Sequence, residues 1–437
     1  MKKTIAILLV AVLAVSSVFA GFSLSGEANV SLKGDFDAKT LGFTNGENKV
    51  KVAIEGTTAE KVNEGDIYAG IKAVLELESG KAMTSATDTA NFIKVKTLKV
   101  KEAYITDGNW KLSILSAATT PTFAKGWETI YDKDNDADKA PVLGSSVASK
   151  YTPKDAEKAV AIPGVTLEVA GWKAGFGLLA SFAENGAKNV LATIATPSFT
   201  FDAVSVKAGA GFANADGKFS VGGGAEAKYA TDVVSATVAA DAVYTAKDEK
   251  FNAAVSANVA IAPVTVDAFF ATKTDLMNKV KTYIDRGYFS NTEVNKNEKE
   301  NYLSAKVVGD LNSFDVPVTI TAVCLDLIND KYFDVEAKAS ISGVNGTLFG
   351  GYQISNEVYH VGLAADYTLA PVGKLYGQVT LFGYSSNVNS TLKLGVENTT
   401  LVSGATLKLE YADALINNIE GLANKAGAVT ASAQIKF

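Results

Sequence analysis

Apolar and polar residues alternate with a period of two along most of this 437-residue chain. Between Phe22 and Lys33, apolar or small residues take the even positions and polar residues the odd ones. The same alternation returns at 49–55, 67–78, 333–341 and 407–411. A period of two indicates β-strands whose two faces meet different surroundings. A barrel with lipid outside and water inside produces this pattern, and so does a soluble β-sandwich with one buried face.

The lengths of the connections favour the barrel over the sandwich. The alternation divides the chain into about 22 candidate strands, and about 18–22 is the predicted range, typical of large antiparallel barrels. The long connections follow odd-numbered strands and are expected at 34–47, 79–91, 118–162, 273–300 and 413–427. In an antiparallel up-and-down barrel, all odd-numbered connections lie at one rim. The sequence therefore predicts an all-β, transmembrane, antiparallel up-and-down β-barrel with an even number of strands.

The last ten residues form one such amphipathic segment, which ends in an aromatic residue. Ala431, Ala433 and Ile435 alternate with polar residues, and Phe437 closes the sequence. This segment resembles the C-terminal strand of bacterial outer-membrane proteins, which is the assembly signal in that class. The resemblance implies that Phe437, Ile435 and Ala433 are recognised by the barrel assembly machinery.

The first 20 residues have the features of a secretory signal peptide. Lys2 and Lys3 are followed by an apolar run, and Val18, Phe19 and Ala20 end it with small residues at the positions that a signal peptidase needs. Cleavage is expected after Ala20, which leaves one barrel domain over 21–437. No apolar run of about 18 residues follows, so no transmembrane helix is expected. Because strand periodicity begins within two residues of the cleavage site, no plug domain is expected either.

Composition excludes some functions. Removal of Lys2 and Lys3 from the 41 basic residues leaves 39 against 47 acidic ones, a net charge of −8, which argues against nucleic-acid binding. The single cysteine, Cys324, rules out an intramolecular disulfide and is expected on the lipid-facing side of its strand. The single histidine, His360, is expected to face the lumen, with Asp366 six residues further on. Without matching catalytic residues, His360 does not predict an enzyme.

As an architecture, the mature chain resembles the bacterial porins. Its lysine-rich, arginine-poor composition and first strand also resemble the major outer sheath porins of spirochaetes. The resemblance implies a location in the outer membrane of a Gram-negative-type bacterium, contact with outer-membrane lipid and a possible homotrimer. Barrels of sixteen or more strands leave an open lumen unless something plugs it. The expected function is passive diffusion of ions and small hydrophilic solutes, without catalysis, cofactor or metal. General porins have arginine clusters at the constriction, whereas this chain has only Arg286.

Two charged segments are candidates for selectivity. The loop 118–162 corresponds in position to the constriction loop of general porins, and the strand 92–105 has a change of phase near Thr97, which predicts a β-bulge. If the loop folds inward, its acidic residues could face the basic ones across the lumen and discriminate between ions. Alternatively, the acidic residues are solvated outside and the basic ones merely line the lumen. The candidates are Asp132, Asp134, Asp136 and Asp138 in the loop, and Lys94, Lys96, Lys99 and Lys101 in the strand.

Other interpretations stay open at this stage. The aspartates of loop 118–162 have the spacing of half a calcium loop, but Ala137 and Leu143 replace its glycine and closing glutamate, which favours simple solvation. The long loops could instead make the barrel a surface-exposed structural or adhesive protein that binds host or neighbouring molecules. A third possibility is an exported soluble β-protein without a membrane role.

Overall fold

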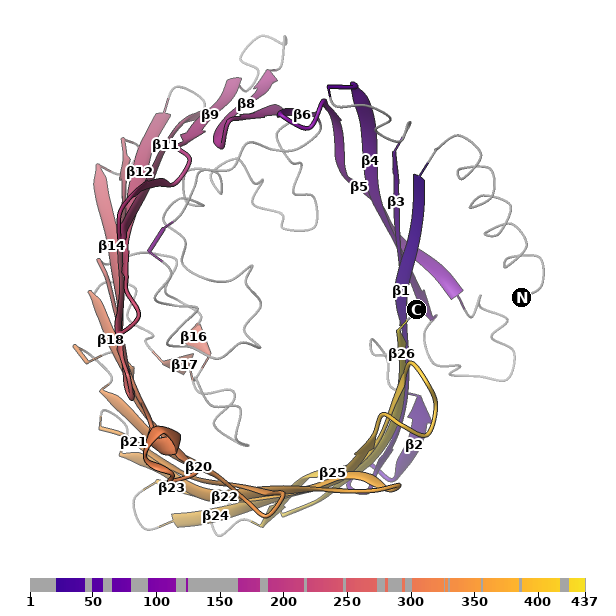
Figure 1. The fold of residues 1–437 in the computed structure, drawn as a ribbon. Coiled ribbons are helices and arrows are strands. Elements are labelled where there is room, and N and C mark those ends of the chain that lie inside the picture. Colours follow the sequence, from indigo (N-terminus) through magenta and orange to yellow (C-terminus); the bar gives the residue numbers. More distant parts are fainter. Residues whose placement is uncertain are drawn as a thin grey trace.

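The structure is a computed structural model in which strands surround a central space (Figure 1). It describes residues 21–43, 49–57, 65–79, 93–114, 123–124, 164–180, 188–215, 218–246, 249–272, 280–281, 293–294, 301–325, 327–328, 331–354, 357–384, 387–416 and 424–436. The predicted signal peptide and Phe437 lie outside these ranges. Among the described residues, no helix is long and apolar enough to cross a membrane.

Nearly all described residues lie in β-strands. The first half of the chain contains β1 (Gly21–Asp35), β2 (Thr40–Phe43), β3 (Lys49–Thr57), β4 (Tyr68–Ser79), β5 (Ile93–Thr106), β6 (Trp110–Ile114), β7 (Gly164–Val169), β8 (Trp172–Ala180), β9 (Lys188–Ala195), β10 (Phe199–Phe201), β11 (Val204–Ala215), β12 (Lys218–Ala230) and β13 (Val234–Thr245). The second half contains β14 (Lys250–Ile261), β15 (Val264–Ala271), β16 (Val280–Lys281), β17 (Glu293–Val294), β18 (Tyr302–Asp310), η4 (Leu311–Phe314), β19 (Val318–Leu325), β20 (Tyr332–Ile341), β21 (Val344–Gln353), β22 (Val358–Leu369), β23 (Gly373–Tyr384), β24 (Asn387–Asn398), β25 (Ala405–Ile416) and β26 (Lys425–Lys436).

One antiparallel sheet of 24 strands contains all of these strands except the β16–β17 pair. Two short strands continue a longer one: β2 and β3 both pair with the same side of β1, and β9 and β10 both pair with the same side of β11. Counting each of these pairs as one position leaves 22 strand positions. The last strand pairs with the first, from Glu27↔Lys436 to Asp35↔Ala428, so the pairings return to their starting strand. The predicted up-and-down topology and even strand number are confirmed.

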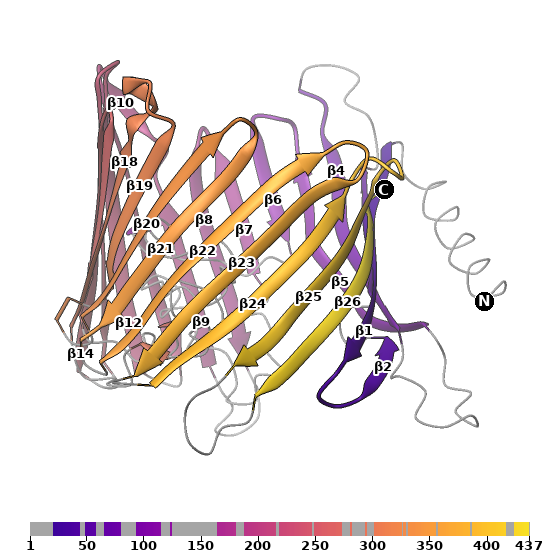
Figure 2. The ribbon, with the colours of Figure 1, turned by 90° about the horizontal axis from the view of Figure 1, so that it is seen from below.

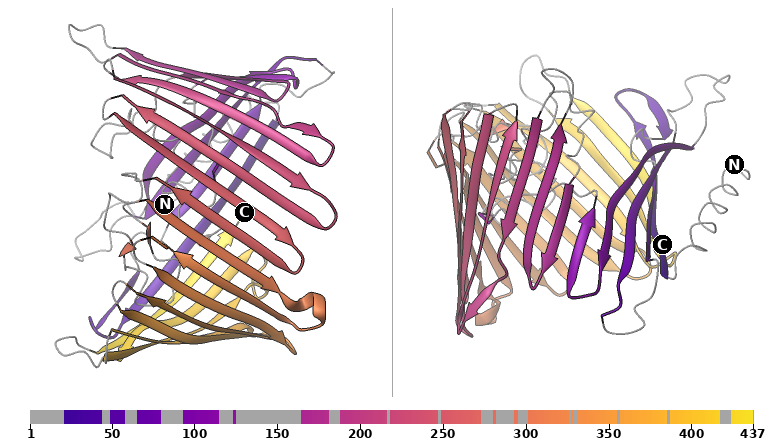
Figure 3. Two further views of the ribbon diagram at one scale, coloured as in Figure 1. Left: turned by 90° about the vertical axis from the view of Figure 1, so that its left-hand side faces the viewer. Right: turned by 90° about the horizontal axis from the view of Figure 1, so that it is seen from above.

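The two rims of the barrel differ in the length of their connections. One rim has short turns at 107–109, 170–171, 202–203, 231–233, 262–263, 342–343 and 370–372, which all follow even-numbered positions (Figure 3). Strands flanking the predicted loops 79–91, 118–162, 273–300 and 413–427 end at the opposite rim, and these loops lie largely outside the described residues. The expected loop 34–47 is shorter than predicted, because β1 runs to Asp35 and β2 occupies Thr40–Phe43.

The sheet exposes its apolar face and buries its polar one. In β20, Phe333 and Val335 are exposed, whereas Asp334 and Glu336, which alternate with them, are buried. Val335 is 50% exposed and Asp334 only 2%. On the neighbouring β21 and β22, Leu348 and the residue opposite it point outward in the same way. A soluble β-sandwich would bury such residues, so this partition is the inverse of a soluble β-protein.

Two bulges interrupt β5, where the sequence predicted one. Along the β4–β5 ladder the pairing passes over Lys96 and again over Lys101, so neither has a direct partner on β4. The bulge predicted near Thr97 is thus displaced by one residue, and the second was missed. The alternation of the sequence shows that the phase changes, but the partner strand decides which residue is extruded.

Candidate functional site: the inner wall of the barrel

In the backbone register, several charged residues lie opposite residues of the other sign on the neighbouring strand. Cross-strand pairs of opposite charge contribute roughly 0.2–1 kcal/mol each, so such rows also help to fix the register of the strands. The register aligns four rows of three residues: Lys49–Glu78–Lys94, Glu55–Lys72–Glu102, Lys111–Glu168–Lys173 and Lys374–Glu397–Lys408.

Ion pairs form within and beside these rows where side chains are described. Lys173 Nζ lies 2.7 Å from Glu168 Oε1 on the adjacent strand. Glu226 is buried and pairs with two lysines. Its Oε1 lies 3.1 Å from Lys207 Nζ and 3.3 Å from Lys228 Nζ. In these regions, positive and negative charges on the wall balance one another locally.

The lysines proposed for selectivity all lie in β5, as predicted. Their backbone register places Lys94 opposite Glu78, and Lys99 opposite Val74. Lys96 and Lys101 occupy the two bulges. The sequence analysis did not predict that Glu78 lies opposite Lys94, because this pairing depends on the register between β4 and β5. The candidate partners across the lumen, Asp132, Asp134, Asp136 and Asp138, lie outside the described residues, so the transverse field between them and the lysines stays a prediction.

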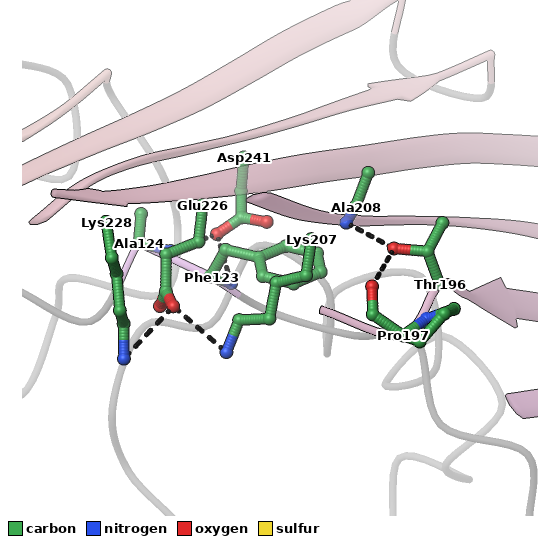
Figure 4. A network of polar contacts seen from close by, with 9 residues as sticks. All are labelled: Phe123, Ala124, Thr196, Pro197, Lys207, Ala208, Glu226, Lys228 and Asp241. Atoms are coloured by element: carbon green, nitrogen blue, oxygen red, sulfur yellow. Dashed lines mark hydrogen bonds and ion pairs between the residues drawn. The ribbon is translucent and has the colours of Figure 1, made fainter. Parts of the chain in front are cut away.

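One described segment of the loop 118–162 lies against the inner wall of the barrel. The backbone N–H groups of Phe123 and Ala124 donate hydrogen bonds of 2.8 and 2.6 Å to Asp241 Oδ2 on β13 (Figure 4). All three residues are buried, and the short coloured segment 123–124 lies inside the ring of strands (Figure 1). Lys207 Nζ lies 5.7 Å from the centre of the Phe123 ring. Residues 123–124 are therefore attached to the lumenal face of β11–β13.

Sequence reasoning did not single out Asp241. Its signal in the sequence is modest: it is the only charged residue of β13, a strand otherwise composed of alanine, valine, serine, threonine and tyrosine. A lone carboxylate on the lumenal face of an uncharged strand needs a partner from elsewhere in the chain, because a buried charge without one is unstable.

His360 faces inward, as expected, where it contacts Asp334 and Tyr332. Its Nε2 lies 2.8 Å from Asp334 Oδ2, and its Nδ1 lies 3.4 Å from the Tyr332 hydroxyl. Gly351 is the residue between Asp334 and His360 in the register. A Cβ at this glycine would lie 2.5 Å from His360 Cε1, so only glycine lets the two side chains meet. Because His360 and Asp334 are buried, this cluster stabilises the wall and offers no reactive group to a solute in the lumen.

A polar basin of about 290 Å³ opens on the inner wall across β21–β25, towards the rim with short turns. Asp366 accepts a hydrogen bond of 2.9 Å from Asn345 and pairs with Lys374 at 3.4 Å. Figure 2 shows these adjacent, tilted strands side by side. The charged and aromatic residues that line the basin are Asp366, Lys374, Tyr376, Lys393, Glu397, Lys408 and Glu410.

Two of the predicted assembly residues, Ala433 and Ile435, lie in the last strand, and Phe437 lies outside the described residues. Ile435 pairs with Ala28 and Ala433 with Val30, and Ile435 is largely exposed. Cys324 lies opposite Phe333, whose side chain is exposed on the outer surface, which agrees with the predicted lipid-facing position.

No protein-family profile and no curated protein matches the chain. Among solved structures it is similar to a mutant porin of Rh. blastica, at 8% identity and a TM-score of 0.32, with 95% of this chain and 100% of that one covered. It is also similar to the translocation pore of the usher PapC, at 9% identity and a TM-score of 0.38, covering 95% and 99%. An anion-selective porin from Comamonas acidovorans shares 14% identity, with a TM-score of 0.30 and coverage of 95% and 99%.

Proposed function

We propose that this protein is an outer-membrane porin, a water-filled channel through which ions and small hydrophilic solutes diffuse passively. The observation that carries the proposal is the partition of the two faces of the sheet. Apolar side chains such as Val335 and Leu348 are exposed outside, while Asp334, Glu336 and His360 face inward. A ring of exposed apolar residues is stable in lipid, and a polar inner wall is stable in water.

The size of the barrel supports an open lumen. Eight strands fill their interior with side chains, whereas sixteen or more leave room for an aqueous channel. With 22 positions this barrel belongs to the wide class. The hydrogen bonds from Phe123 and Ala124 to Asp241 support the proposal that the loop 118–162 enters the lumen and narrows it. The balanced rows of charge predict weak discrimination between small anions and cations.

The remaining features of the proposal concern export and assembly. Residues 1–20 direct export and are cleaved after Ala20, and β26 with Phe437 is recognised by the barrel assembly machinery. The rim with long loops faces the exterior and the rim with short turns the periplasm, as is usual in outer-membrane barrels. The outer face contacts outer-membrane lipid and can support a homotrimer.

Single-channel recording tests the proposal. The protein is purified, folded in detergent and inserted into planar bilayers, and its reversal potential is measured in a salt gradient. Discrete openings of large conductance with a reversal potential close to zero are expected. A strongly non-zero reversal potential would contradict the balanced wall but not the pore. A folded, inserted protein that never conducts would contradict the pore itself and favour the adhesive alternative.

A further inference from the structure

We infer that the basin on the inner wall of β21–β25 binds small zwitterionic solutes, such as amino acids and short peptides. The carboxylate of the solute would lie against Lys393 and Lys408, and its ammonium group against Glu397. The inference rests on the proposed channel and names a class of solute that the channel would favour.

The positive side of the basin has more ammonium groups than carboxylates to balance them. Glu410 Oε2 accepts a hydrogen bond of 2.7 Å from the Tyr376 hydroxyl, and it lies 2.9 Å from Lys408 Nζ and 3.3 Å from Lys393 Nζ. One carboxylate is thus shared by two lysines, which leaves a local positive charge. Both lysine side chains are partly exposed to the lumen, and each ammonium has three donors. Donors therefore remain for the carboxylate of a solute.

The negative side of the basin is Glu397. It lies opposite Lys374 on one neighbouring strand and Lys408 on the other, but those lysines bind Asp366 and Glu410 respectively. Within the described part of the chain, no hydrogen bond or ion pair involves the Glu397 carboxylate. Its side chain is only half-buried, so it can accept hydrogen bonds from an ammonium group in the lumen.

The arrangement favours a solute with both charges over a solute with one. Three lysines and three carboxylates line the basin, so its net charge is zero, and an anion or a cation alone satisfies only one of its two sides. A zwitterion can satisfy the surplus lysine charge and Glu397 together. The volume of about 290 Å³ corresponds to about ten water molecules at ~30 Å³ each, enough for an amino acid or a dipeptide.

The floor of the basin is held rigid by an aromatic residue. The Tyr376 ring crosses over Gly395 to reach Glu410, since Gly395 lies between the two in the register. A Cβ at Gly395 would lie 2.1 Å from Tyr376 Cζ, so this crossing requires glycine. Because the basin is open to the lumen, a bound solute can leave again, and weak binding of this kind is what permeation needs.

The test compares a zwitterion with uncharged and singly charged probes of similar chemistry. Glycylglycine, N-acetylglycinamide, acetate and methylammonium are added in turn to the protein in planar bilayers, and channel conductance is recorded. Glycylglycine alone is expected to lower the conductance in a saturable manner. Glu397→Gln and Lys393→Gln should each raise its half-blocking concentration about tenfold, the loss expected for one charge-assisted contact. The control is Lys173→Gln, because Lys173 is also half-exposed and paired with a glutamate but lies on the other side of the barrel. This substitution should leave the half-blocking concentration of glycylglycine unchanged.

Two results would overturn the inference while leaving the channel intact: an equal effect of N-acetylglycinamide, or an unchanged half-blocking concentration in Glu397→Gln. A folded protein that never conducts would instead refute the channel. In that case, calorimetric titration of the detergent-folded protein with glycylglycine still decides the matter. Saturable heat that is lost in Glu397→Gln supports the site, and its absence in the wild type refutes it.

Discussion

Asp241 is predicted to hold the loop segment 123–124 against the wall, and its loss should widen the channel. Asp241→Ala removes the acceptor of two backbone N–H groups, those of Phe123 and Ala124, both of which are buried. A hydrogen bond to a charged group contributes about 1.5–3 kcal/mol, so the two together amount to about 3–6 kcal/mol. These contributions are already net of desolvation, and the lower end of the range, about 3 kcal/mol, is a conservative value for the attachment.

A loss of about 3 kcal/mol shifts the ratio of attached to detached segment roughly 100-fold. We expect larger single-channel conductance and greater open-channel noise in Asp241→Ala. Asp241→Asn keeps the shape and one neutral acceptor and should give an intermediate effect. The control is Asp267→Ala, because Asp267 is also a buried lumenal carboxylate but accepts its hydrogen bond from Asn258 on the same wall. Conductance and noise equal to the wild type in a correctly folded Asp241→Ala would refute the reasoning.

Three further predictions concern the outer face, the first strand pairing and a turn. Leu348→Arg places a charge on the outer face and should destabilise the barrel in lipid by about 2–4 kcal/mol, whereas Thr347→Arg on the inner face should cost little, as measured by urea unfolding in vesicles. The Asp37 carboxylate accepts hydrogen bonds of 2.7 and 3.2 Å from backbone N–H groups at the start of β26. Asp37→Ala should therefore lower the free energy of unfolding by about 1–2 kcal/mol and increase hydrogen exchange along β1 and β26. Unchanged exchange in these two strands would contradict the prediction. Hydrogen bonds from the backbone N–H groups of Trp110 and Asn109 hold the pKa of Asp107 below its ordinary value. The contribution of Asp107 to the stability of the 107–109 turn is therefore present at neutral pH and is lost as pH falls through that lowered pKa. Asp107→Asn should abolish this acid dependence, seen in hydrogen exchange of the 107–109 turn, and a wild-type turn insensitive to acid would refute it.

The alternation of residue types was sufficient to predict an all-β chain, since a period of two over many segments indicates β-strands with two unlike faces, and the lengths of the connections favoured the barrel over the sandwich. The parity of the long connections followed from the chain order and predicted the even strand number. Local boundaries were less certain: the connection expected at 34–47 contains the last two residues of β1 and all four of β2, because the pairing of β1 with β2 extends the ladder.

The partners of the charged residues could not be predicted, because they depend on register. In the sequence the acidic residue Asp366 follows His360 by six positions, yet the neighbour of His360 is Asp334, two strands away across Gly351. The lysines of β5 form a basic series in the sequence, but the register with β4 places the acidic Glu78 opposite Lys94.

The sequence by itself determined which residues share a face of each strand, because away from bulges this depends only on counting by two. Only the tertiary structure decided which strands lie side by side, and therefore which charges meet. Asp241 meets residues 123–124 from more than a hundred positions away, and the basin draws on five strands. These contacts depend on strand register and on the path of a loop, and the alternation specifies neither.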